Sequence, residues 1–364
     1  MTSVFVIAQS AVTAEHIQHV LSVSKDLEIV RISLGEDGYL NHLQRSKADI
    51  VAIDSSRGES ETDRITQEIM HTHPLPVVIL ASAGLHNGVS QSIHALEAGA
   101  LTVLQLPDNT HEEQSRRAAA DVCKSLRLMS EVKVVRRWES TLFESIAKAG
   151  NNDEHEEECK NAIEIVVIGA SAGGTNALQV VFDTLPADFP VPILVVQHIA
   201  AGYVDGLVRW LSEQCALPVV LAESGIIPQP GCIYLAPDNH HLTVDRKRCI
   251  LLTNEESVNG FRPAIARLFS SVHDVYGAHT AAVLLSGMGN DGAAEMRQLY
   301  DAGACTIAQD KETSLIHGIP GEAIKLAATR HILPVQEIGK KLDVLTRISP
   351  SDTMRDETGS TENL

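Results

Sequence analysis

Short and mostly apolar runs recur along the first part of this chain, and stretches with helical spacing separate them. Runs of this length that are apolar throughout are typical of strands in a parallel sheet covered on both faces. The five runs are VFVIA (Val4–Ala8), LEIVRI (Leu27–Ile32), DIVAID (Asp49–Asp54), PVVIL (Pro76–Leu80) and ALTVLQL (Ala100–Leu106). Thr13–Ser24 and Val89–Ala98 are examples of the intervening helix-like segments. This alternation predicts an open, doubly wound α/β sheet.

The same alternation starts again after a strongly acidic segment. Residues 151–158 read NNDEHEEE and contain no apolar side chain. A run of like charge cannot contribute to a core, so we expect a solvated linker, with an exposed turn inside one larger domain as the alternative. The later strand-like runs are IEIVVIGA (Ile163–Ala170), PILVVQHI (Pro192–Ile199), CIYLAP (Cys232–Pro237), HLTVD, CILLT, AAVLLSG (Ala281–Gly287) and TIAQD (Thr306–Asp310).

The chain is therefore predicted to form two α/β domains, which its 364 residues also favour at roughly 150 residues per domain. We expect the first domain over residues 1–128 and the second over residues 162–345. Residues 129–161 would form a helical and acidic linker, and the polar residues 346–364 a disordered tail.

Charge and cysteine usage exclude several classes of function. The formal net charge is −18, which disfavours binding to a phosphate backbone or an anionic membrane. The six cysteines are widely spaced, with no CxxC pair, and single thiols of this kind fit a reducing compartment. The N-terminus lacks a basic start with a long apolar stretch, and no run approaches the ~20 apolar residues of a membrane span. We therefore expect a cytoplasmic protein that is not inserted in a membrane.

The sharpest motif follows the strand-like run IEIVVIGA. Gly169-Ala-Ser171-Ala-Gly173 matches the G-x-S-x-G pattern, in which a turn between strand and helix exposes a serine Oγ at the edge of a sheet. The helix after the turn offers N–H groups to a developing oxyanion. A dinucleotide-binding loop is an alternative, but Ser171 replaces its middle glycine and no acid ends the next strand. Close strand–helix packing at the glycines is the other alternative.

Two more polar residues are placed to complete a hydrolytic site. His198 ends the next predicted strand, and Asp291 follows the run AAVLLSG within GMGNDG. Ligands of doubly wound sheets bind at the carboxyl ends of the strands, so both side chains are expected near Ser171. A nucleophile, a base and an acid that orients the base is the arrangement of a serine hydrolase. Each residue alone would be an ordinary loop residue.

The segments IEIVVIGASAGGTNAL, LVVQHI, IYLAPDNHHL and LLSGMGNDGAAEM, in this order, resemble the catalytic domain of chemotaxis protein-glutamate methylesterases of the CheB type. The resemblance spans Ile163–Leu345 and includes AGACTIAQD and GIPGEAI. It implies that Ser171 is the nucleophile, His198 the general base and Asp291 the orienting acid.

The resemblance also implies roles for four further residues. Backbone N–H groups of Met288 and of Ala172, where many relatives have Thr, would form the oxyanion hole. His241 in the APxxxH segment would line the site, and Arg262 would bind substrate carboxylates. No metal or organic cofactor is implied, and the histidines at 71, 73, 240 and 241 lack partners at a recognised metal-binding spacing.

The implied reaction is hydrolysis of γ-glutamyl methyl esters, and deamidation of glutamines, on cytoplasmic helices of methyl-accepting chemoreceptors. The receptor and the pathway, flagellar or pilus-type, stay open. A chemosensory histidine kinase or a pilus-pathway signalling protein would be a further partner. The alternative function is a non-catalytic signalling adaptor that binds partners through its first domain.

Enzymes of this family carry a flavodoxin-like response-regulator receiver domain at the N-terminus, and Asp54 would be its phosphoacceptor. Receiver chemistry needs an acidic pair after the first strand, where this chain has Ala8 and Gln9. It also needs Ser or Thr after the fourth strand, where Ala81 precedes Ser82. Leu106 stands where the required Lys precedes a proline. The sequence therefore predicts a degenerate receiver that regulates without ordinary phosphorylation, since nothing holds Mg²⁺ or pairs with phosphate.

Overall fold

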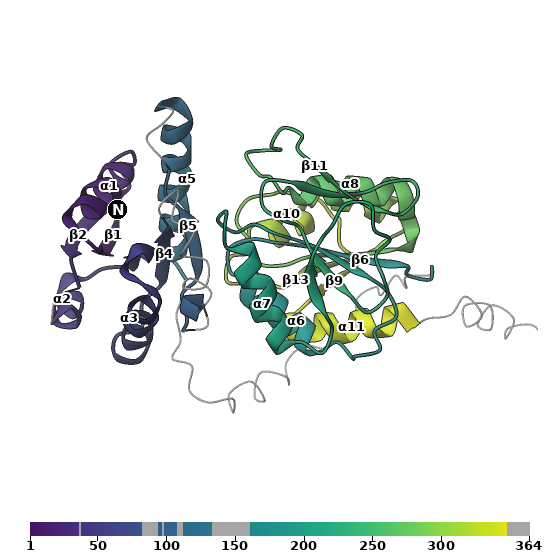
Figure 1. The fold of residues 1–364 in the computed structure, drawn as a ribbon, viewed down its shortest axis with the longest axis horizontal. Helices are drawn as coiled ribbons and strands as arrows, with labels where there is room; N and C mark the ends of the chain where they lie inside the picture. Colours follow the sequence, from purple (N-terminus) through teal and green to yellow (C-terminus); the bar gives the residue numbers. More distant parts are fainter. Residues whose placement is uncertain (36–37, 82–93, 97, 108–111, 133–160, 348–364) are drawn as a thin grey trace, which may run out of the picture. The chain divides into compact units, whose positions relative to one another are not determined.

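The fold was obtained as a computed structural model, which describes residues 1–35, 38–81, 94–96, 98–107, 112–132 and 161–347. The chain divides into two compact units, and each is built on its own parallel sheet (Figure 1). The predicted class, two doubly wound α/β domains, is confirmed. Most of the expected linker and the expected tail lie outside the described residues.

The N-terminal unit has a five-stranded parallel sheet in the order β2-β1-β3-β4-β5. Its strands are β1 (Thr2–Ile7), β2 (Leu27–Ser33), β3 (Ile50–Asp54), β4 (Val77–Ala81) and β5 (Thr102–Gln105). Its helices are α1 (Ala11–Leu21), α2 (Tyr39–Ser46), the 3₁₀ turn η1 (Ser55–Arg57), α3 (Glu59–Thr72) and α5 (Glu112–Ser130). All five predicted strands are present, whereas the helix expected over Val89–Ala98 falls largely outside the described residues.

Local sequence explains where elements of this unit begin. Ser10 caps α1, since its hydroxyl accepts from the N–H of Thr13 while the Thr13 hydroxyl accepts from the N–H of Ser10. The strands β3 and β4 are buried along their whole length, as their continuous apolar runs predict. Strand order reverses at β1, which lies between β2 and β3, so the carboxyl ends of β1 and β3 border the crevice where such sheets bind ligands.

The C-terminal unit has a seven-stranded parallel sheet in the order β14-β13-β12-β6-β7-β9-β8. Its strands are β6 (Ile165–Ala170), β7 (Ile193–Gln197), β8 (Val219–Leu221), β9 (Ile233–Leu235), β12 (Thr280–Leu284), β13 (Cys305–Gln309) and β14 (His331–Leu333). Its helices are α6 (Gly174–Asp183), α7 (Val204–Gln214), α8 (Ile265–Tyr276), the 3₁₀ turn η3 (Gly277–His279), α9 (Ala293–Asp301), α10 (Ile319–Lys325) and α11 (Val335–Arg347).

Two features of this unit differ from the sequence prediction. The runs HLTVD and CILLT leave the main sheet and form a separate antiparallel ribbon of β10 (His241–Val244) and β11 (Ile250–Thr253). The strands β8 and β14 were not predicted, because each has only three residues and lies at an edge of the sheet with part of its surface exposed.

The middle of the larger sheet positions the site. Strand β6 pairs with β12 on one side and with β7 on the other, and all residues of the three strands are buried. Because the strands are parallel, their carboxyl ends meet at one edge of the sheet. Between the sheet and α8 lies a continuous apolar cluster that includes Ile165, Val167, Leu268 and Phe269.

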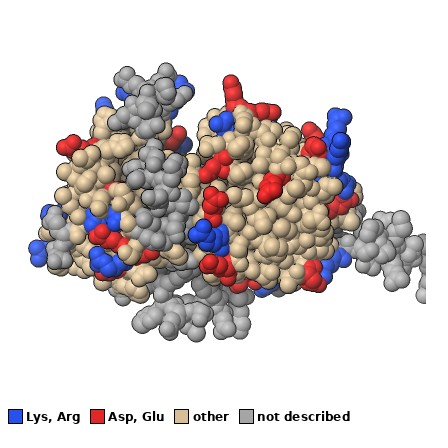
Figure 2. All heavy atoms as spheres, viewed as in Figure 1, with Lys and Arg blue, Asp and Glu red and all other residues tan. Residues whose placement is uncertain are grey.

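The structure can be compared with the expectations about cysteines, membrane-spanning helices and surface charge. Cys123, Cys215, Cys232 and Cys249 are free thiols, but Cys305 is disulfide-bonded, so the expectation of single thiols is wrong at that position. No helix within the described ranges is both long and apolar enough to cross a bilayer. On the face drawn in Figure 2, basic side chains occur in small groups separated by acidic and uncharged residues.

Candidate active site

Ser171 directly follows β6 and opens the turn into α6. The N–H of Gly174 donates to the carbonyl of Ser171 at 2.8 Å, and Gly173 has φ 76° and ψ −4°. These values are those of the third residue of a type II turn, which requires positive φ and therefore favours glycine. The left-handed residue of this strand–helix turn is thus Gly173, two residues after the serine, rather than the serine itself.

The backbone of Ser171 stays attached to the sheet on the β12 side. Its N–H donates to the carbonyl of Ser286 at 3.0 Å, which extends the pairing of β6 and β12 beyond the strand ends. The Ser286 hydroxyl is buried, donates to the carbonyl of Ala172 at 2.8 Å and accepts from the N–H of Ile316 at 3.0 Å. Ser286 therefore holds the turn through both its main chain and its side chain.

His198 directly follows β7, and its N–H donates to the carbonyl of Ala170 at 2.9 Å. Its Nε2 lies 3.0 Å from Oδ2 of Asp291, and the two side chains are 7% and 1% exposed. The two atoms are as close as those of an ion pair, but their geometry is not that of a hydrogen bond. Nδ1 is buried and has no hydrogen-bond partner among the described residues, so one ring nitrogen faces the acid and the other is unpaired.

Asp291 is fixed by the first turn of α8. Its Oδ2 accepts from the N–H of Ile265 at 2.7 Å, and its Oδ1 accepts from the N–H of Ala266 at 3.1 Å. A carboxylate at a helix N-terminus satisfies unpaired donors and interacts favourably with the helix dipole. The α8 N-terminus therefore holds the negative charge against His198.

The loop after β12 lies against the serine. An added Cβ on Gly287 would be 2.8 Å from Ser171 Cβ, so only glycine permits this approach. Gly318 packs equally closely on the other side, where a Cβ would lie 2.6 Å from the Gly287 carbonyl and 3.2 Å from Met288 Cα. Gly287, which precedes the predicted oxyanion residue Met288, thus lies against Ser171, and the other predicted oxyanion residue, Ala172, follows Ser171 in the chain. The Ala172 N–H has no acceptor among the residues described.

His241 and Arg262 are placed differently from these residues. His241 begins β10 and is fully buried, with Nδ1 accepting from the N–H of Ala264 at 3.2 Å. Because that N–H can only donate, Nε2 carries the ring proton and donates to the carbonyl of Glu256 at 3.1 Å. Arg262 is exposed, and its Nη1 donates to the carbonyls of Asn254 and Glu255 at 3.3 and 3.1 Å.

Sequence reasoning assigned no role to Phe261, which stacks on the imidazole of His198. The ring centroids are 4.0 Å apart and the planes differ by 3°. Phe261 closes a tight turn with Val258, each donating its N–H to the other's carbonyl, and the two residues between them have φ 52° and 87°. Positive φ at both central positions is what the dipeptide Asn259-Gly260 favours. The dipeptide could have predicted the tight turn from the sequence, but it could not have predicted that Phe261 stacks on His198.

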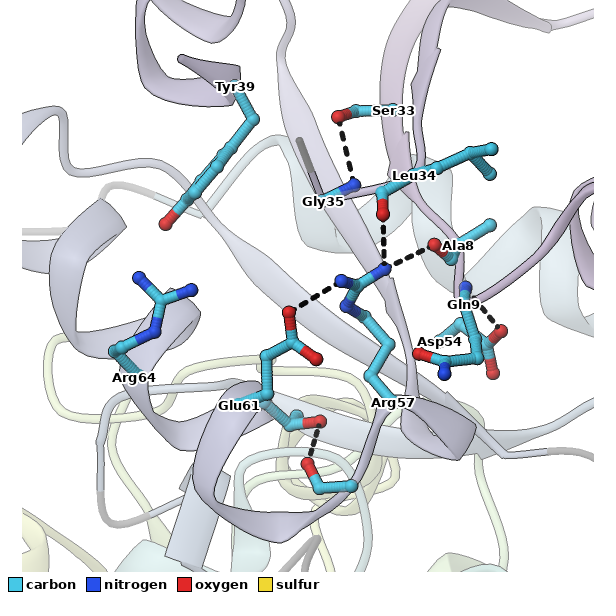
Figure 3. Close-up of polar contacts among 12 residues, drawn as sticks. Ala8, Gln9, Ser33, Leu34, Gly35, Tyr39, Asp54, Arg57, Glu61 and Arg64 are labelled. Atoms are coloured by element: carbon cyan, nitrogen blue, oxygen red, sulfur yellow. Dashed lines mark hydrogen bonds and ion pairs between the residues drawn. The ribbon is translucent and has the colours of Figure 1, made fainter. Parts of the chain in front are cut away.

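The carboxylate of Asp54 in the N-terminal unit is held by hydrogen bonds, of which Figure 3 shows the one from Gln9. Asp54 is fully buried and accepts from the N–H of Gln9 at 3.0 Å, from the N–H of Ser56 at 3.0 Å and from the Ser56 hydroxyl at 2.7 Å. Both carboxylate oxygens are therefore engaged by groups of the protein. Ala8 and Gln9 supply no carboxylate there, and Ser82 lies outside the described residues.

Arg57 places a positive charge at the loops that follow β1 and β2. Its Nη1 donates to the carbonyls of Ala8 and, at 3.0 Å, of Leu34, while its Nη2 pairs with Glu61 at 2.6 Å (Figure 3). Its side chain is 5% exposed. A Cβ on Gly35 would lie 1.9 Å from Nη2, so glycine leaves the space that the guanidinium fills. The loops after β1, β2 and β3 are thus tied together by one cation. No three His, Cys, Asp or Glu side chains among the described residues form a metal-binding group.

A serine, a histidine and an aspartate at neighbouring strand ends of a doubly wound α/β sheet are the arrangement predicted from the sequence for a serine hydrolase. The sequence profile of the CheB methylesterase family matches residues 166–342. A protein-glutamate methylesterase/protein-glutamine glutaminase of Nitrosospira multiformis is 38% identical and covers 94% of this chain and 96% of its own. One from Syntrophus aciditrophicus is 36% identical, covering 94% and 97%.

The chain belongs to the protein-glutamate methylesterase/protein-glutamine glutaminase family. The predicted enzyme class, with both activities, is therefore confirmed. Among solved structures, the Thermotoga maritima CheB methylesterase catalytic domain is similar at 34% identity, with a TM-score of 0.49 over 51% of this chain and 100% of that one.

Proposed function

We propose that this enzyme demethylates glutamate methyl esters and deamidates glutamines on the cytoplasmic helices of methyl-accepting chemoreceptors, in a bacterial chemosensory pathway. A substrate of this kind requires a cytoplasmic enzyme. A chemosensory histidine kinase or a pilus-pathway signalling protein is the further partner that we propose. Arg262, exposed on the loop before α8, would contact acidic side chains of the receptor helices.

The observation that carries the catalytic proposal is the meeting of three groups at adjacent strand ends. Ser171 follows β6, His198 follows β7, and Asp291 lies beyond β12 with its carboxylate 3.0 Å from His198. Nδ1 of the imidazole has no hydrogen-bond partner among the described residues, and we assign it as the nitrogen that takes the Ser171 proton. This arrangement favours the enzyme over the non-catalytic adaptor, which would need none of these contacts.

The reaction then follows in two steps. Ser171 Oγ attacks the ester carbonyl carbon while His198 takes the hydroxyl proton, and Asp291 stabilises the resulting imidazolium. The N–H groups of Ala172 and Met288 would bind the oxyanion. His198 returns the proton to the departing methanol, leaving an acyl-enzyme. Water then adds to the acyl carbon and gives a proton to His198. His198 passes this proton to Ser171 Oγ as the acyl bond breaks, which releases the glutamate and regenerates the free serine. With glutamine as substrate, ammonia replaces methanol as the leaving group.

Methanol release from a methylated chemoreceptor cytoplasmic fragment tests this proposal. We expect release by the wild-type chain and none above background by Ser171→Ala, with both proteins folded by circular dichroism. Equal release by Ser171→Ala and wild type would rule out the serine as nucleophile. Absence of release by wild type across the receptors of one cell would favour the adaptor.

We propose also that the N-terminal unit regulates without phosphorylation at Asp54. Both Asp54 oxygens accept hydrogen bonds from Gln9 and Ser56, and Arg57 supplies a fixed positive charge near the position where receivers bind Mg²⁺. Incubation with acetyl phosphate and Mg²⁺, followed by intact mass measurement, provides the test. We expect no phosphoryl adduct, and a stable adduct lost in Asp54→Ala would overturn the proposal.

A further inference from the structure

Gln197, the last residue of β7, contacts both residues to which we assign the chemistry. Its Nε2 donates to the carbonyl of Ser171 and to the carbonyl of His198, each at 2.8 Å. The residue is only 5% exposed. One side-chain amide therefore joins the main chain of the proposed nucleophile to that of the proposed base.

The orientation of this amide follows from its neighbours. Both contacted atoms are carbonyl oxygens, which only accept, so the NH₂ group must face them. Oε1 is then directed toward Gly174, where an added Cβ would lie 2.5 Å away. The absence of a side chain at Gly174, the first residue of α6, is what admits the amide.

Oε1 of Gln197 is buried without a hydrogen-bond partner in the described part of the chain. A buried unpaired acceptor is unfavourable, and an apolar side chain of similar shape would avoid it. Fold stability alone therefore does not account for glutamine at this position. Its NH₂ group, by contrast, uses both hydrogens on the two active-site carbonyls.

These bonds complete the fixation of the two backbones. The N–H of Ser171 is held by Ser286 across β12, and the N–H of His198 is held by Ala170 across β6. Gln197 donates to the carbonyl of each residue, so the N–H and the carbonyl of both Ser171 and His198 are hydrogen-bonded. Only the side-chain torsions then remain free to bring Ser171 Oγ and the imidazole together.

We propose that Gln197 is a positioning residue that sets the spacing between the main chains of Ser171 and His198. The inference rests on the proposed catalytic roles of these two residues. Displacement of reacting groups by about 1 Å can lower a rate about 100-fold, so loss of this bridge should slow the chemical step. Substrate binding away from the reacting carbonyl should change little.

The test uses Gln197→Met, which keeps length and burial but has no donor. We expect kcat to fall about 10- to 100-fold with KM within about twofold of wild type. Active sites are titrated with a fluorophosphonate, so that kcat refers to folded sites. Gln197→Asn retains the amide on a side chain one methylene shorter, and its kcat should also fall. This variant tests the proposal if the Met variant does not fold.

Ser271→Ala is the control, because the Ser271 side chain likewise makes two hydrogen bonds to main-chain atoms but lies in the middle of α8. Its hydroxyl accepts from the N–H of Val244 and donates to the carbonyl of Leu268. Its kcat per titrated site should equal that of wild type. If both Gln197 variants match Ser271→Ala while Ser171→Ala is inactive, the positioning role is wrong and the catalytic roles stand. If Ser171→Ala is active, the catalytic roles fail and this inference fails with them.

Discussion

At the scale of a single residue, Asp291 binds the first N–H groups of α8 and, in the mechanism that we propose, also orients His198. Replacing it with Asn retains one oxygen for the helix N–H groups but removes the negative charge beside the imidazole. We expect Asp291→Asn to lower kcat by about 10⁴-fold. We expect Asp291→Ala to lose the same activity and also about 0.5–2 kcal/mol of unfolding free energy from the missing cap.

Methanol release measures the contribution of Asp291 to kcat, and chemical denaturation measures its contribution to stability. The Asn variant should unfold at a denaturant concentration between those of wild type and the Ala variant. An Asn variant with near-wild-type kcat would show that the charge of Asp291 does not contribute to catalysis.

Phe261 contributes at the same scale through its stack on His198. An aromatic stack is worth about 0.5–1.5 kcal/mol, so Phe261→Leu should lower kcat/KM by roughly 2- to 12-fold, since a mobile imidazole is less often aligned. Phe261→Tyr keeps the stack and should retain activity. The steady-state rates of both variants are the measurement, and equal rates for Leu and Tyr would show that bulk alone matters.

Among elements, α2 is tied to α3 by a side-chain hydrogen bond whose strength depends on pH. The hydroxyl of Tyr39, the first residue of α2, donates to Glu68 of α3 at 2.5 Å. This bond lowers the pKa of Glu68, with Arg64 acting in the same direction and burial opposing them. Since the folded pKa lies below the unfolded one, the stabilisation is present above the ordinary Glu pKa of about 4.3 and is lost as the pH falls through the folded pKa.

Tyr39→Phe should therefore lower the unfolding free energy by about 1 kcal/mol at neutral pH. The difference from wild type should shrink as the pH falls from about 5 to about 3. Urea unfolding monitored on the N-terminal unit measures both. In a Glu68→Gln background the effect of Tyr39→Phe should not vary over this pH range, and a persistent pH dependence there would assign it to another group.

The strands also show which parts of the fold can be predicted from the sequence. The apolar runs predicted all five strands of the first sheet and five of the seven strands of the second, all but the edge strands β8 and β14. The pattern is clearest in the strands buried along their whole length, because burial on both faces imposes a continuous apolar run. Parallel pairing then placed Ser171, His198 and Asp291 at one edge. What the pattern could not predict depends on contacts between distant segments.

The N-terminus of α8 is an example of such a contact. Ala264 occupies the N-cap and has no side chain that could cap the helix. The N–H of Ala264 instead donates to His241 from β10, and the N–H groups of Ile265 and Ala266, the first two residues of α8, donate to Asp291 from the loop after β12. The hydrogen-bond partners of His241 are distant in sequence, so no local motif predicts them. Gln197 and Phe261 were overlooked for the same reason, since their partners are set by the three-dimensional fold.

Considered as a whole molecule, the chain is built of two compact units, and the C-terminal unit has an apolar core of its own. The apolar cluster of the second unit is drawn entirely from residues between Ile165 and Ala328. A fragment of residues 162–347 retains this cluster together with Ser171, His198 and Asp291, so we expect it to fold alone in one cooperative transition. Its methanol release should be abolished by Ser171→Ala, as in the full chain.

The comparison of this fragment with the full chain tests what the N-terminal unit does. Because both Asp54 oxygens already accept hydrogen bonds from Gln9 and Ser56, acetyl phosphate should change kcat/KM of the full chain by less than about twofold. A fragment faster than the full chain would assign an inhibitory role to the N-terminal unit that is independent of phosphorylation. Stimulation of the full chain by acetyl phosphate, abolished in Asp54→Ala and absent from the fragment, would instead restore the unit to an ordinary receiver.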